Sequence, residues 1–89
     1  MLSMDDLLDY CELDRDEIAA VAEHEHLPLA VAAELSENLV DTPEGVAQLH
    51  QMVLDNIQHA KETGNKQHVR ELARAYLHLQ KTHPIRAAA

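Results

Sequence analysis

The residues best suited to chemistry form the run Glu23-His24-Glu25-His26, in which carboxylates and imidazoles alternate. Both groups are common ligands of transition metals. In a helix, however, residues two apart point about 200° away from each other, so His24 and His26 cannot bind one metal ion together. Glu23 and His26 are three apart and share a face, which is the Glu-x-x-His spacing of di-iron carboxylate bundles.

A second interpretation makes this run the polar end of a helix, and we favour it. Di-iron bundles need the Glu-x-x-His pair twice, together with two further glutamates, whereas this chain contains the pair once. Pro28 disfavours helical geometry at Leu27, which puts His26 in the last turn, where a cationic histidine is favourable. A symmetric dimer would supply the second pair, so a small metal-binding protein that uses Glu23 and His26 is the alternative.

The other histidines divide into two groups on the predicted helices. His50 and His83 fall on inward-facing stripes and are further candidate metal ligands, although an inward histidine is more often hydrogen-bonded within a core or an interface. His59, His68 and His78 fall on outer or flanking faces, and we expect them to be exposed. All seven histidines of the chain titrate near neutral pH.

Catalytic chemistry has little support in the sequence. Cys11, the single cysteine, lies among Asp9, Glu12 and Asp14, whose negative charges disfavour the reactive thiolate. The chain has two glycines, so it lacks a glycine-rich loop for a phosphate group. We therefore predict that the protein is not an enzyme and carries no cofactor.

Charge is distributed unevenly along the chain. Residues 1–45 hold thirteen acidic residues and one arginine, a net charge of −12, whereas residues 46–89 hold three acids and six bases, a net charge of +3. The helices predicted at 15–25 and 28–40 resemble a helix-turn-helix, but residues 28–40 contain no lysine or arginine. Because phosphate neutralisation dominates DNA affinity, we predict no binding to nucleic acid.

Neither a membrane span nor a secretion signal is indicated. The longest apolar runs are far shorter than the ~20 residues that a membrane helix needs. The start of the chain is acidic from Asp5 onward and has no basic region. A single cysteine cannot form an internal disulfide, which suits a reducing compartment. These features predict a cytoplasmic location and no association with membranes.

Start and stop signals predict an all-α fold with about five helices in one domain, residues 1–89. Ser3 is a candidate N-cap for a short helix to Tyr10, and Asp14 with Glu17 resembles a capping box at the start of the next. Thr42-Pro43 and Asn65 begin two long helices, which end near Thr63-Gly64 and Thr82. The expected helices cover residues 3–10, 15–25, 28–40, 42–63 and 65–82.

These helices predict two parts of one bundle. Short acidic helices over residues 1–41 pack on an antiparallel helical hairpin over residues 42–83, and residues 84–89 form a frayed tail. The helix over 28–40 is apolar around most of its circumference, which is typical of a central helix that is buried on several sides.

The hairpin also carries the predicted interface. The apolar arcs of its two helices are wider than a single seam between them requires, so each must contact something else. We predict a non-catalytic protein–protein interaction or self-association module, a homodimer first among the possibilities, with an interface at Leu54, Ile57, Tyr76 and Leu77. In the competing interpretation the chain is a monomer, and the helix over 28–40 fills the same groove.

Overall fold

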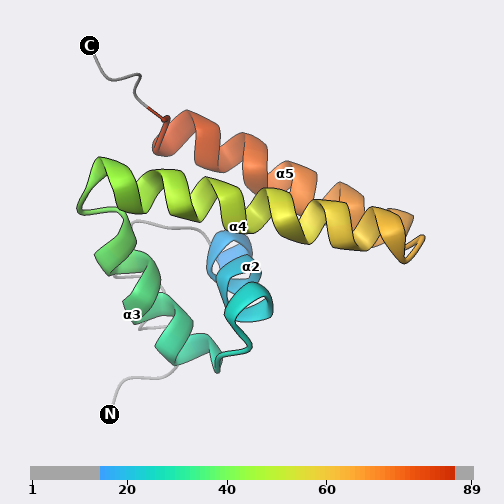
Figure 1. Ribbon diagram of the computed structural model, residues 1–89, viewed down its shortest axis with the longest axis horizontal. Coiled ribbons are helices and arrows are strands. Elements are labelled where there is room, and N and C mark those ends of the chain that lie inside the picture. Colours follow the sequence, from blue (N-terminus) through green and yellow to red (C-terminus); the bar gives the residue numbers. More distant parts are fainter. Residues whose placement is uncertain (1–14, 86–89) are drawn as a thin grey trace.

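The computed structural model describes residues 15–85, and this part of the chain is helical throughout with short connections (Figure 1). Its helices are α2 (Arg15–Glu25), α3 (Leu29–Leu39), α4 (Pro43–Glu62) and α5 (Lys66–Thr82). The predicted all-α fold is confirmed, with four helices in the described residues. The helix predicted over residues 3–10 and most of the predicted tail lie outside them.

Local signals in the sequence explain where the two long helices begin. The side chain of Thr42 accepts a hydrogen bond from the backbone N–H of Gly45 (3.0 Å), and Pro43 is the first residue of α4. Between α4 and α5, Gly64 has a φ angle of +73°, a conformation that costs glycine little. The side chain of Asn65 then accepts from the N–H of His68 (3.1 Å) and caps α5.

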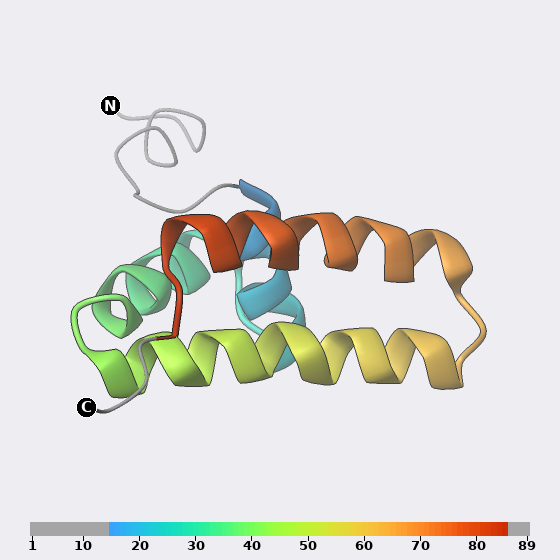
Figure 2. The same ribbon diagram turned by 90° about the horizontal axis from the view of Figure 1, so that it is seen from above.

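The helices α4 and α5 lie side by side, and α2 and α3 pack on one side of the pair (Figures 1 and 2). α2 contacts all three other helices, whereas the main contacts of α3 are with α2 and α4. The core lies between α2 and the long helices, where Ile18, Val21, Leu49, Val53 and Leu79 are fully buried. None of the described helices is long and apolar enough to cross a membrane.

The prediction that the helix over 28–40 is the central one is therefore wrong, because α2 has that position. α3 buries mainly small side chains, those of Ala32, Ala33 and Ser36, while Val31 stays 46% exposed. An alanine side chain is apolar but offers little surface to bury. Because much of the apolar circumference of α3 is alanine, the prediction from the sequence overestimated how much of this helix is buried. Ile18 and Val21 supply larger apolar groups from α2.

The corner between α3 and α4 depends on a close approach of two backbones. Gly45, in the first turn of α4, is buried against the last residue of α3. A Cβ atom at Gly45 would lie 2.0 Å from the carbonyl oxygen of Leu39, which is an impossible contact. The lack of a side chain at this position lets α4 begin directly against the end of α3.

Candidate functional site

An exposed apolar surface lies on the side of the α4–α5 pair away from α2 and α3, and we call it the open face. On α4, Leu54 points about 130° away from the buried stripe, and on α5, Leu77 points about 165° away from it. Leu54 is 39% exposed and Leu77 is 65% exposed. Ile57 and Tyr76, also predicted at the interface, are partly buried and pack against the core.

Cations surround Leu77 on the outer side of α5. Lys66, Arg70, Arg74 and Lys81 are exposed and fall with Leu77 in an arc of about 80° on the helix, and we call these four residues the basic stripe. The only acidic residue of α5, Glu71, lies outside this arc. None of these four cations makes an ion pair with a carboxylate of residues 15–85, so the described carboxylates do not neutralise the basic stripe.

The basic stripe continues into a shallow apolar hollow beside the turn between α4 and α5. This hollow has a volume of about 380 Å³ and is lined by Ala60, Gly64 and Val69, with Lys61, Lys66 and Arg70 also in its lining. An apolar floor with a cationic border suits an apolar side chain that carries a carboxylate neighbour. The open face therefore combines exposed leucines, partly buried apolar groups and positive charge in a chain whose net charge is −9.

A second set of functional side chains joins α2 to the long helices through histidine–carboxylate pairs. His78 of α5 donates from Nδ1 to the Glu17 carboxylate of α2, which is fully buried. His68 of α5 donates from Nε2 to Glu23 of α2, with an N–O distance of 2.5 Å. Beside these pairs, the side-chain amide of Asn56 in α4 donates to the backbone carbonyl of Ala20 (2.7 Å).

The third pair, His24 with Asp55 of α4, has an unusual proton arrangement. The Nδ1 of His24 lies 2.7 Å from a Glu25 oxygen and its Nε2 lies 3.1 Å from an Asp55 oxygen. Carboxylates only accept hydrogen bonds, so both ring nitrogens must carry protons, and the imidazole is then cationic. Burial alone would lower the pKa of His24, but the hydrogen bonds and charges of Glu25 and Asp55 outweigh it and raise the pKa. Hydrogen bonds from Gln51 and then His24 lower the pKa of Asp55.

The run from Glu23 to His26 forms the C-terminal end of α2. The helix ends at Glu25, His26 adopts a left-handed conformation with φ +57°, and the N–H of Leu27 bonds to the carbonyl of Ala22 (3.0 Å). This 6→1 bond is the signature of a Schellman motif. His26 thus lies one residue beyond the helix, and Glu23, instead of sharing a helical face with it, pairs with His68.

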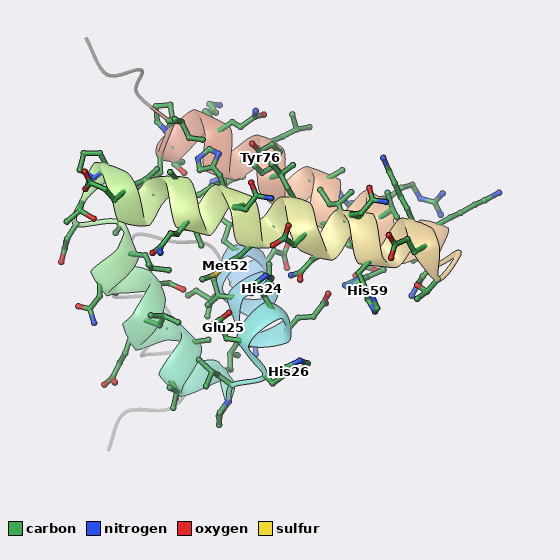
Figure 3. All side chains as sticks on the ribbon, viewed as in Figure 1. His24, Glu25, His26, Met52, His59 and Tyr76 are labelled. Carbon is green, nitrogen blue, oxygen red and sulfur yellow. The ribbon has the colours of Figure 1, made fainter. Side chains whose placement is uncertain are left out.

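The end of α2 borders an open hollow that several histidines share. His24, His26, His59 and His68 line this hollow of about 550 Å³. Figure 3 shows that His24 and His26 come from the end of α2, while His59 extends from α4 on the same side of that helix. Among the described residues, no three histidines, cysteines or carboxylates are close enough together to hold a metal ion.

His50 and His83, the other candidate ligands, lie at the opposite end of α4. The ring of His50 is 2% exposed, and its Nε2–H donates to the backbone carbonyl of His83 (2.7 Å). Its Nδ1 lies 3.2 Å from the hydroxyl oxygen of Tyr76, whose ring packs edge-on against it. This imidazole has a partner at both nitrogens and ties the end of α5 to α4 through the backbone of His83.

Sequence reasoning missed the three histidine–carboxylate pairs. It placed His68 and His78 on outer or flanking faces and treated Glu17 as part of a helix cap. The pairs join residues 31 to 61 positions apart, so no local spacing signals them. For two of them the sequence carries one trace, the concentration of acids in the first half and of histidines in the second half, whereas His24 and Asp55 pair in the opposite sense.

Comparisons with other proteins add no relative to this description. The chain matches no family model, and neither the curated proteins nor the solved structures contain a significant match to it.

Proposed function

We propose that this protein is a non-catalytic interaction module that binds a protein partner, most simply a second copy of itself, through the open face of α4 and α5. The observation that carries the proposal is the exposure of Leu77, 65%, and of Leu54, 39%, on the sides of α5 and α4 that point away from their buried stripes. Single exposed leucines are common on protein surfaces. Here, however, the two lie on adjacent helices, which also carry the partly buried apolar side chains of Ile57 and Tyr76.

Charge supports an association between copies. The basic stripe of one copy would meet a molecule whose first half carries thirteen acidic residues. Opposite charges at an interface mainly raise the association rate and fix the orientation of the partners. A twofold dimer is the commonest closed arrangement and uses each complementary contact twice.

Light scattering over a range of concentrations tests the proposal. We expect a mass above the 10.0 kDa of one chain, rising with concentration. The variants Leu54→Glu and Leu77→Glu should return the mass to one chain without unfolding it, because both side chains are already exposed. Val31→Glu is the matched control, since Val31 is 46% exposed on α3 and lies away from the open face.

Three results would count against the proposal. A mass of one chain at every concentration rules out self-association. If Leu54→Glu or Leu77→Glu unfolds the protein, measured by circular dichroism, that leucine belongs to the core of the monomer. An equal loss of association in Val31→Glu would show that added negative charge, and not the loss of an apolar contact, separates the copies.

A further inference from the structure

We propose that the acidic segment 1–14 docks, within the same molecule, on the outer side of α5 along the basic stripe. This contact would cover Leu77 and make the segment a built-in competitor for one half of the open face. The proposal does not rest on self-association, because the docking is intramolecular. It is carried by three features, namely the chemistry of the stripe, the chemistry of the segment and the point at which the segment joins the described chain.

The chemistry of the basic stripe suits a ligand that has both apolar groups and carboxylates. Its four cations make no ion pair with a carboxylate of residues 15–85. Leu77 lies within their arc and is the most exposed large apolar side chain in the described part of the chain. A ligand for this surface needs an apolar group for Leu77 and carboxylates on its flanks.

Segment 1–14 has that composition. It contains five acidic residues and no basic residue. On the helix that the sequence predicts over residues 3–10, three apolar side chains would share an arc of about 100°, and two carboxylates would occupy the adjoining arc. The apolar set is Met4, Leu7 and Leu8, and the adjoining acidic set is Asp5 and Asp9.

The point of attachment favours docking in the same molecule. The segment joins α2 at Arg15, and two residues later Glu17 bonds to His78 of α5. On α5, His78 lies only about 40–100° around the helix from Leu77, Lys81 and Arg74, which is an arc of roughly 4–10 Å at the helix surface. Residues 11–14 alone span about 13 Å when extended, so they can cross this distance.

Weak contacts are sufficient because the segment is tethered. Each exposed ion pair contributes roughly 0–1 kcal/mol and is screened by salt. A connection of only a few residues, however, gives an effective concentration on the order of millimolar, so even a low intrinsic affinity fills the site in part. The docked state should accordingly be populated at low ionic strength and reduced at high ionic strength.

A nitroxide spin label on Cys11 tests the contact in the full-length protein, because this residue is the only thiol in the chain. Paramagnetic broadening of backbone amide signals reports which residues approach the label. We expect the amide signals of residues 73–81 in α5 to lose intensity in dilute, low-salt solution, and those of α3 to keep theirs. High salt should restore the α5 signals.

Charge reversal shows whether the basic stripe is responsible. The double variant Arg74→Glu/Lys81→Glu should recover the α5 signals, whereas the control Lys61→Glu, at the far end of α4, should leave the broadening unchanged. If a label on Cys11 blocks docking, the label is moved to Ser3→Cys in a Cys11→Ser background, and the same residues of α5 should broaden.

Further outcomes separate this proposal from the proposed function. Mixing spin-labelled chains with isotope-labelled chains that carry Cys11→Ser should leave α5 unbroadened, since only a contact between molecules is visible in the mixture. Broadening in the mixture would overturn intramolecular docking and would instead assign the segment to the interface between copies. The proposal would also be overturned if neither the label on Cys11 nor the label at position 3 broadened the α5 signals. The same holds if the broadening persisted in Arg74→Glu/Lys81→Glu.

Discussion

Removal of His78 should destabilise the protein more than its half-exposed position suggests, because its partner Glu17 is fully buried. The His78→Ala variant takes the imidazole away from a carboxylate inside the protein. Loss of a hydrogen bond to a buried charged group costs about 1.5–3 kcal/mol. In a domain of this size each kcal/mol lowers the thermal midpoint by roughly 4–8 °C, so we expect a decrease of about 10 °C or more.

A second substitution distinguishes this cause from a simple loss of packing. In Glu17→Leu/His78→Ala no buried carboxylate remains, so the double variant should be more stable than His78→Ala alone. Gln80→Ala, also exposed on α5, is the control and should change the free energy of unfolding by less than about 0.5 kcal/mol. The measurement is urea unfolding followed by circular dichroism near pH 7. The reasoning is refuted if His78→Ala matches the control, or if Glu17→Leu lowers stability further in the His78→Ala background.

Four other predictions concern pH, packing and metal. The raised pKa of His24 adds stability that is fully present below pH 6.5, the pKa of the unfolded chain, and is lost as the pH rises through the folded pKa. The free energy of unfolding should therefore fall over that pH range. In His24→Gln this dependence of the free energy of unfolding on pH should be weaker. The lowered pKa of Asp55 adds stability that is present above pH 3.8, the pKa of the unfolded chain, and is lost as the pH falls through the folded pKa. Urea unfolding at a series of acidic pH values measures this loss. Gly45→Ala should cost about 1–3 kcal/mol, because its Cβ meets the Leu39 carbonyl, and unchanged stability would contradict that contact. EDTA should leave the thermal midpoint unchanged, whereas a decrease of more than about 10 °C would favour the metal-binding alternative.

Features of the fold that depend on adjacent residues were predictable from the sequence. Thr42 and Asn65 cap helices by bonding to N–H groups three residues ahead, and Gly64 takes a backbone angle that few other residues tolerate. These effects act within one turn of helix. The sequence therefore predicted the limits of α2 and of the two long helices to within one or two residues.

Features that depend on distant partners were not predictable in the same way. Residues of the run of alternating acids and histidines have different partners. Glu23 bonds to His68 of α5, His24 bonds to Asp55 of α4, and His26 takes the left-handed conformation that ends α2. The order of residues alone holds no information on which helix lies opposite each one. The sequence predicted Leu54 and Leu77 at one edge of their apolar stripes. It did not predict which helices cover the rest of each stripe, because those contacts join residues that are far apart in the chain.

The position of α2 among the other helices also has a consequence for the order of folding. Its bonds close long loops, 61 residues for Glu17 with His78 and 36 for Ala20 with Asn56, whereas His50 and Tyr76 are 26 apart. Closing the longest of these loops costs about 0.8 kcal/mol more chain entropy than closing the shortest. The pair α4–α5 should therefore form the folding nucleus, and α2 should dock after the transition state. Substitutions in α2, such as Ile18→Val, should then accelerate unfolding and leave the folding rate nearly unchanged.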